Sequence, residues 1–325
     1  ASAIDDDVER FIQGVKKPYN PILGEFFRCQ YSFDDDSKSF YISEQVSHHP
    51  PITAMYYNNP QHAIRIRGEI RPLSKFFGNS VGMILDHKSY GAIYLDRHNE
   101  EYRITYPNMY ARGILFGKMM LELGEKSTVT CEKLDLRCEV EFKTKGLFSG
   151  QYNQIEGRIT RISDPRETLY CISGNWQTRT FIKDFKTGES SVLFDSSLED
   201  VVLKEVPRLE EQEENESRWL WQHVTEAIKT RDQNMATTEK TKIEEAQRKA
   251  ARQRLANNEE WVYRFFRHVP DEDIYLPMIK VDGNEIESLP SDPEEASALL
   301  QKWIFTKPDG SIPNCVKDDM SSIPL

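Results

Sequence analysis

The chain has 325 residues, of which 38% are hydrophobic, so by length it can form one large domain or two small ones. Its formal net charge of −11 disfavours a general affinity for nucleic acid, so any anion site must be a local cluster of basic groups. The number of cysteines is odd, no CxxC spacing occurs and no secretory leader is visible, which favours a reduced cytosolic protein. The sequence contains no run of about 18 apolar residues, so we expect no membrane-spanning helix.

The first residues, 1–14, predict a short helical piece. An acidic run at residues 5–7 precedes Val8, Phe11 and Ile12, whose spacing suits one or two helical turns.

Residues 15–206 favour strand after strand. The clearest candidate is 136–143, where apolar and charged side chains alternate with a strict period of two. Other candidates, separated by turn-like sequences, are 64–67, 82–86, 91–96, 102–106, 128–132, 154–162, 168–174, 178–183 and 191–195. Roughly ten strands with short connections predict a sandwich or a barrel, and a large antiparallel barrel can enclose a ligand.

Residues 207–325 change to a helical pattern. Helices are predicted at 217–230, with apolar residues on one side, at 237–261, with few apolar residues, and at 296–305. No internal repeat and no second core are visible, so we expect a single domain over residues 1–325, with residues 207–325 as its C-terminal helical subdomain.

The most unusual stretch is EQVSHHPP at residues 44–51. Proline cannot donate to a sheet ladder, so regular pairing should end or bend at Pro50. Adjacent strand residues point to opposite faces, so His48 and His49 do not readily share a metal, but their ring N–H groups could bind phosphate oxygens. Taken alone, such a pair is more often a core residue beside an exposed one.

This stretch resembles the signature of the oxysterol-binding-protein-related family of lipid-transfer proteins. Two further motifs of that family are present, and the three occur in the family's order along the chain: KKPYNPILGE at residues 16–25 precedes EQVSHHPP, and EKTKIEEAQR at residues 239–248 follows it. The resemblance implies a mainly β fold with helices, in which a near-complete antiparallel β-barrel encloses a lipid tunnel between an N-terminal helix and a C-terminal helical subdomain. The family's lid and a Trp-containing stretch before KKPYNP are not visible, so lid behaviour stays open.

The resemblance also implies the residues of a phosphoinositide site: Lys17, Asn20, His48, His49, Lys240, Glu244 and Arg248. The last three recur every fourth residue and so share one helix face. In the family the two cations would meet phosphates while Glu244 orients them, whereas such a ladder taken alone is usually a solvated helix surface. Lys17 and Asn20, together with Ser74, would contact the headgroup of a second lipid.

There is a physical reason to assign these residues to one binding site. An inositol 4-phosphate headgroup carries two phosphate groups, and burying it needs several cations and donors at once because unpaired buried charge is costly. No GxSxG, P-loop, HExxH or clustered Cys/His spacing is present, so the sequence predicts no enzyme, no metal and no cofactor. A lipid-modifying esterase that uses the histidine pair is the remaining enzymatic alternative.

The resemblance therefore implies a domain that exchanges phosphatidylinositol 4-phosphate for phosphatidylserine between membranes at contact sites. Residues 220–225, EEAQRKAAR at 244–252 and residues 257–261 look most like the phosphatidylserine-exchanging subfamily, and a carrier or sensor that exchanges sterol is the alternative. The protein would be cytosolic and touch membranes transiently, at endoplasmic reticulum–plasma membrane contacts, with any adaptor or anchor outside this chain and no nucleic acid partner.

Overall fold

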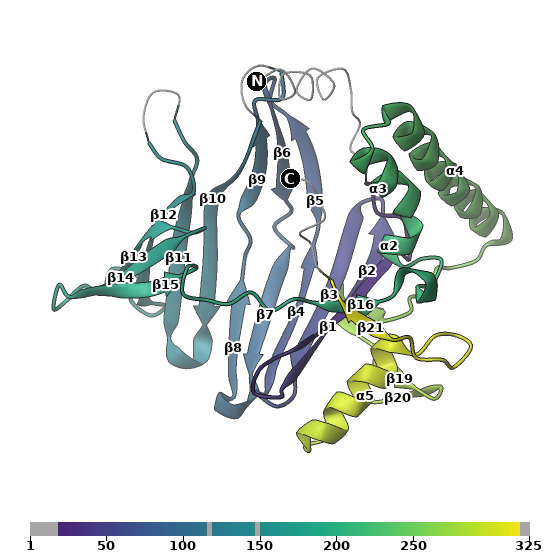
Figure 1. Cartoon of the computed structure of the whole chain (residues 1–325). Coiled ribbons are helices and arrows are strands. Elements are labelled where there is room, and N and C mark those ends of the chain that lie inside the picture. The colour runs from purple at the N-terminus through teal and green to yellow at the C-terminus, as the bar shows by residue number, and fades with distance from the viewer. Residues whose placement is uncertain (1–18, 116–118, 147–149, 319–325) are drawn as a thin grey trace. The chain divides into compact units, whose positions relative to one another are not determined.

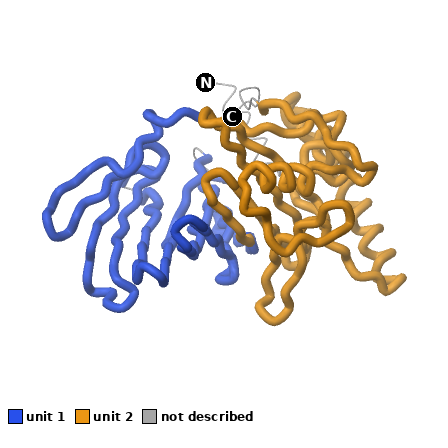
Figure 2. The backbone as a smooth tube through the Cα atoms, turned by 90° about the horizontal axis from the view of Figure 1, so that it is seen from below, with its two compact units in different colours: residues 1–14, 70–201 blue, residues 15–69, 202–325 orange. Residues whose placement is uncertain are grey.

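The computed structural model describes residues 19–115, 119–146 and 150–318, so the predicted helical piece at 1–14 lies outside the described residues. The chain divides into two compact units (Figure 2). Of the described residues, those within 70–201 form the first unit, and those within 19–69 and 202–318 form the second. The single domain predicted over residues 1–325 stays a prediction.

The first unit is built from antiparallel strands joined by short turns (Figure 1). Its strands are β5 (Pro72–Phe76), β6 (Ser80–Leu85), β7 (Tyr90–Leu95), β8 (Glu100–Ile104), β9 (Asn108–Arg112), β10 (Met120–Cys131), β11 (Leu136–Lys143), β12 (Gln154–Arg161), β13 (Thr168–Asn175), β14 (Arg179–Asp184) and β15 (Ser190–Asp195), with short 3-10 turns η1 (Asp96–His98) and η2 (Glu132–Leu134). From β10 to β15 each strand pairs with the next, and β10 also pairs with β8 and β9.

The second unit combines a smaller antiparallel arrangement with the described helices. Its strands are β1 (Phe26–Ser32), β2 (Lys38–His48), β3 (Pro51–Asn59), β4 (Ile64–Ile70, whose last residue belongs to the first unit), β16 (Glu205–Pro207) and β21 (Cys315–Lys317). Five of these strands pair in the order β3–β2–β1–β16–β21. The helices are α2 (Ser217–Leu220), α3 (Gln222–Lys229), α4 (Gln233–Asn257) and α5 (Pro293–Phe305), preceded by the 3-10 turn η3 (Leu209–Glu211).

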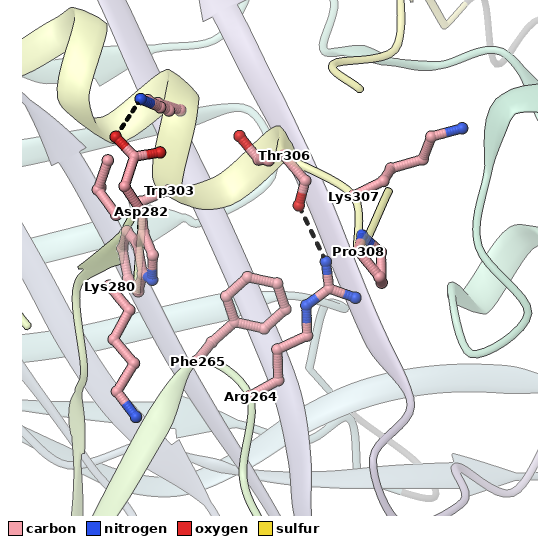
Figure 3. Close-up of a pocket in the computed structure, with 10 residues that line it drawn as sticks. Arg264, Phe265, Lys280, Asp282, Trp303, Thr306, Lys307 and Pro308 are labelled. Carbon is pink, nitrogen blue, oxygen red and sulfur yellow. Dashed lines mark hydrogen bonds and ion pairs between the residues drawn. The ribbon is translucent and has the colours of Figure 1, made fainter. Parts of the chain in front are cut away.

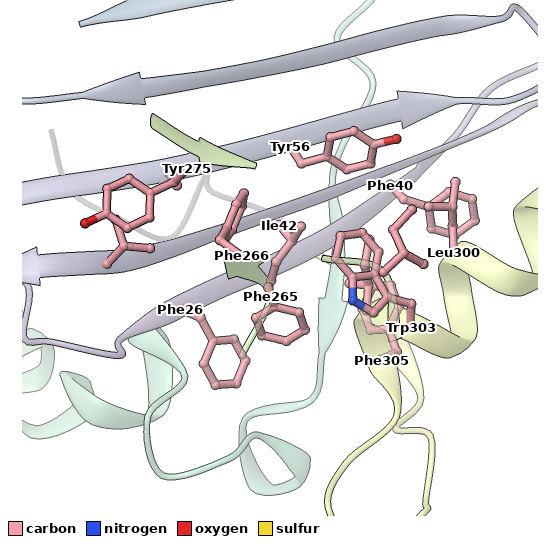
Figure 4. Close-up of a cluster of buried hydrophobic side chains, with 14 of the residues drawn as sticks. Phe26, Phe40, Ile42, Tyr56, Phe265, Phe266, Tyr275, Leu300, Trp303 and Phe305 are labelled. Carbon is pink, nitrogen blue, oxygen red and sulfur yellow. The ribbon is translucent and has the colours of Figure 1, made fainter. Parts of the chain in front are cut away.

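Two small hairpins complete this unit, β17 (Phe266–Val269) with β18 (Ile274–Pro277) and β19 (Lys280–Val281) with β20 (Asn284–Glu285). Figure 4 shows the core that joins them to the sheet: aromatic and aliphatic side chains from β1, β2, β3, the segment at 265–266 and α5 pack together. Phe40, Ile42, Leu300 and Ile304 are completely buried there, so α5 is held on one face of β2.

The mainly β fold with C-terminal helices is confirmed, and each predicted strand is present within a few residues, except that 128–132 is only the end of the longer β10. The predicted helix at 217–230 is wrong as a single element, because it is interrupted at Trp221 between α2 and α3. The predicted helix at 237–261 is displaced. It begins earlier because the Asp232 carboxylate accepts from the Met235 amide, and it ends where Asn258 is left-handed at a φ of 55°. Closure of the strands into a barrel around a tunnel stays a prediction.

Candidate functional site

The two histidines lie at the turn between β2 and β3. His48 ends β2 opposite Pro51, the first residue of β3, so regular pairing ends before Pro50 as predicted. The expectation that the two side chains point to opposite faces is wrong. Because His49 already belongs to the turn, the two rings meet edge-on with their centroids 4.6 Å apart. His48 is partly exposed and His49 is exposed, so both imidazoles are available at one surface point.

The loop at residues 19–25, hereafter the 19–25 loop, runs beside this turn. The Gly24 amide donates to the carbonyl of Gln45 at 2.9 Å, and the Gln45 amide donates to the carbonyl of Glu25 at 2.8 Å. His48 Nδ1 lies 3.0 Å from the carbonyl oxygen of Pro21. Burial lowers the pKa of His48, and the hydrogen bond to Pro21 opposes that shift. The loop and the histidine turn are therefore one hydrogen-bonded assembly.

Helices α2 and α3 hold the other side of the 19–25 loop. The Tyr19 hydroxyl lies 2.8 Å from Thr225 Oγ1, and the Tyr19 ring meets Trp221 edge-on at 5.4 Å. The buried Glu25 carboxylate accepts hydrogen bonds from Ser217 Oγ at 2.7 Å and from Trp221 Nε1 at 3.0 Å. Burial raises the pKa of Glu25, and these donors oppose the rise. Asn20 is thus carried, exposed, on a loop fixed at both ends.

The stripe on α4 forms the third part of the site. Glu244 Oε1 lies 3.6 Å from Lys240 Nζ, and Glu244 Oε2 lies 3.3 Å from Arg248 Nη2. The exposed fractions of the three side chains are 14% for Lys240, 24% for Glu244 and 62% for Arg248. Glu244 therefore lies between two cations and contacts both, which is the arrangement expected from the spacing.

All three parts belong to the second unit. The charge of Glu244 raises the pKa of His48 and the charge of Arg248 lowers it, so α4 acts electrostatically on the histidine turn. Two predicted residues are not placed there. Lys17 lies outside the described residues, and Ser74 lies exposed on β5, in the first unit. Their roles stay predictions.

Trp261 is a contributor that sequence reasoning missed. Gly24 has a φ of 78°, and a Cβ placed on it would lie 2.2 Å from Trp261 Cζ2, so only glycine allows the indole to pack against the 19–25 loop. The guanidinium of Arg254, near the end of α4, lies 4.9 Å from the Trp261 ring centroid. The glycine in KKPYNPILGE was the available signal, but its partner 237 positions later was not.

Two pockets lie in the second unit, and the histidines line neither of them. One, of about 460 Å³, is lined by Ile22, Leu23, Glu214, Asn215, Leu220, Lys242, Ile243, Ala246, Gln247, Ala250, Arg254 and Trp261. The other, of about 310 Å³, lies at the end of α5. Figure 3 shows Phe265 between Trp303 and Arg264, and Arg264 donates to the carbonyl of Thr306. Lys302 in the same pocket pairs with Asp282. None of the predicted site residues lines either pocket.

Comparison with known proteins places the chain. A family model described as oxysterol-binding protein matches residues 6–229. An oxysterol-binding protein homolog of Schizosaccharomyces pombe is 44% identical over 275 residues, which are 81% of this chain and 57% of that protein. The oxysterol-binding protein-like protein OBPa of Candida albicans is 40% identical over 310 residues, which are 90% of this chain and 71% of that protein. The chain belongs to the oxysterol-binding protein family.

Further comparisons show how much of a longer relative this chain covers, and which solved structures share its fold. Human oxysterol-binding protein-related protein 5 is 42% identical over 278 residues, but the match covers 79% of this chain and only 31% of that protein. The Osh1 ORD domain in complex with ergosterol has a TM-score of 0.65 at 21% identity, covering 92% of this chain and 73% of that one. The Osh3 ORD in complex with PI(4)P from Saccharomyces cerevisiae has a TM-score of 0.60 at 18% identity, covering 91% and 76%. The chain therefore has the ORD fold.

Over residues 19–318, apart from the two short internal gaps, no helix is both long and apolar enough to cross a membrane. Within the same ranges, no group of three or more His, Cys, Asp or Glu side chains is arranged to hold a metal ion.

Proposed function

We propose that this domain binds phosphatidylinositol 4-phosphate with its headgroup at the histidine turn, the 19–25 loop and the α4 stripe, and exchanges it for phosphatidylserine between membranes. The observation that carries the proposal is that Lys240 and Arg248 both contact one carboxylate, Glu244, and that the charges of Glu244 and Arg248 act on His48, in a chain of net charge −11. Such a local concentration of donors and cations suits a ligand with several phosphate charges.

The parts have complementary tasks in this proposal. Lys240 and Arg248 supply permanent positive charge, and Glu244 keeps both side chains oriented before the ligand arrives. The imidazoles and the Asn20 amide supply directional donors from a backbone that hydrogen bonds already fix. The matching of the Osh3 ORD, which was solved with PI(4)P, to the same fold supports this ligand class.

The second lipid is proposed from sequence resemblance. Residues 220–225 form the end of α2 and the start of α3, directly against the 19–25 loop, and they look like the phosphatidylserine-exchanging subfamily. Ser74, Lys17 and Asn20 would then contact the serine headgroup. Sterol is the other candidate, because Osh1 structures of the same fold contain ergosterol and cholesterol. In either case the domain acts as a carrier, without catalysis, and works between membranes at contact sites with any anchor outside this chain.

Charge reversal on α4 tests the headgroup site. Arg248→Glu places a second acid beside Glu244, so we expect affinity for a short-chain phosphatidylinositol 4-phosphate to fall by more than about tenfold, or about 1.4 kcal/mol. The matched control is Lys249→Glu, an equal charge change at the next residue, which is exposed and about 100° away around the helix. Equal affinities of the two variants would make the stripe an ordinary solvated helix face, whose ion pairs contribute only a few tenths of a kcal/mol to stability.

A further inference from the structure

The Pro21 carbonyl decides which nitrogen of His48 carries hydrogen. Nδ1 lies 3.0 Å from that oxygen, which has no hydrogen and can only accept, so Nδ1 must be the donor. A neutral imidazole has one N–H, and Nε2 of neutral His48 therefore carries a lone pair and no hydrogen. The nitrogen left for a ligand is an acceptor as long as the ring is uncharged.

Phosphate oxygens are also acceptors, so neutral His48 would face a bound phosphate with one lone pair against another. Protonation of Nε2 turns this repulsion into a charge-assisted hydrogen bond. His49 differs, because along the described stretches of the chain no hydrogen bond fixes either of its nitrogens, and its neutral ring can donate from whichever one faces the ligand. The two neighbouring histidines are thus not equivalent.

We propose that uptake of a phosphate-monoester headgroup is coupled to the binding of one proton by His48, which serves the phosphate only as an imidazolium. This inference rests on the proposed function of the same site. The proton is added at Nε2 and comes from solvent, Nδ1–H stays on Pro21, and no covalent bond of the ligand changes.

The groups around His48 are consistent with this coupling. His48 contacts the Pro21 carbonyl and the His49 ring, and the charges of Glu244 and Arg248 on α4 act on it. Burial has the largest effect, lowering the pKa of His48 from its ordinary value of 6.5. The free ring is therefore mostly neutral at pH 7. A bound phosphate adds negative charge and raises the pKa of His48, so affinity must fall as the pH rises above neutrality.

Calorimetric titration of the full chain with a short-chain phosphatidylinositol 4-phosphate tests the coupling. Repeating it in two non-phosphate buffers of different ionisation enthalpy gives the number of protons taken up, and we expect about one per lipid at pH 7.5. The affinity should fall about tenfold between pH 7 and pH 8, because one proton is linked to binding. A phosphate monoester, with a second pKa of about 6, is already a dianion over that range and contributes little to the change.

Two matched variants identify the histidine. His48→Asn can still donate to Pro21 but cannot titrate, so it should bind more weakly, without proton uptake and with one affinity from pH 7 to pH 8. His49→Asn should bind more weakly at every pH yet keep the proton uptake. If the wild type binds the lipid without taking up a proton, the proposed coupling is wrong. It is also wrong if proton uptake is lost in His49→Asn but kept in His48→Asn. No binding by the wild type at any pH between 6 and 8 would overturn the proposed function itself.

Discussion

Arg28→Ala is expected to lower the free energy of unfolding of the second unit by about 3–5 kcal/mol, because it leaves a buried carboxylate without its cation. The Arg28 side chain is completely buried. It donates to Glu216 at 2.9 Å and to the carbonyl of Ile304 at 2.9 Å, and it lies 3.2 Å from Glu213. Glu216 is 1% exposed, so water cannot replace the guanidinium. A loss of this size is a large fraction of the 5–15 kcal/mol typical of a domain.

Urea unfolding followed by circular dichroism measures this effect. The control is Arg267→Ala, which removes a guanidinium that is 55% exposed and pairs with Glu285, and it should change stability by less than about 1 kcal/mol. Burial raises the pKa of Glu216 while Arg28 opposes the rise, so without Arg28 the pKa rises further. The penalty applies to the ionised form, and it should shrink as the pH falls through that raised pKa. Equal stabilities of wild type and Arg28→Ala would contradict the role of this network.

Replacing His48 and His49 together with alanine should remove extraction of phosphatidylinositol 4-phosphate from liposomes. Each imidazole is proposed to make a hydrogen bond to a charged phosphate, worth about 1.5–3 kcal/mol, so affinity should fall by about a hundredfold or more. Both rings are at least partly exposed, so stability should change by less than about 1 kcal/mol and extraction of the second lipid should persist.

The matched control replaces His87 and His98, two exposed histidines of the first unit, with alanine. It removes the same number of imidazoles from the chain and should leave extraction unchanged. Normal phosphoinositide extraction by the His48 and His49 double variant, together with a wild-type melting curve, would remove the histidine turn from the site.

The strands were predictable because their signal is local. The alternating stretch at residues 136–143 has the same bounds as β11, since the side chains of a strand point to its two faces in turn whatever its partners are. The helix-like spacing of Lys240, Glu244 and Arg248 likewise predicted the ladder seen on α4. In both cases the signal is a regular spacing between residues that are only two or four positions apart in the sequence.

Long-range partners were not predictable from one sequence. In the Glu-rich run at 209–216, residues 209–211 form a 3-10 turn and Glu216 is buried against Arg28, 188 positions away. The helix at 237–261 was misplaced because its ends depend on the Asp232 cap and on the left-handed Asn258. The tautomer of His48 depends on the Pro21 carbonyl, a backbone group that no residue pattern reveals.

Exchange between liposomes tests the central claim most directly. Donor liposomes carry labelled phosphatidylserine, acceptor liposomes either contain or lack phosphatidylinositol 4-phosphate, and the full chain is added to both. If one cavity takes the two lipids in turn, phosphatidylserine should move faster to acceptors that contain phosphatidylinositol 4-phosphate, and Arg248→Glu should remove that acceleration. The same phosphatidylserine rate with both acceptors, or acceleration of a labelled sterol in place of phosphatidylserine, would contradict the proposed exchange.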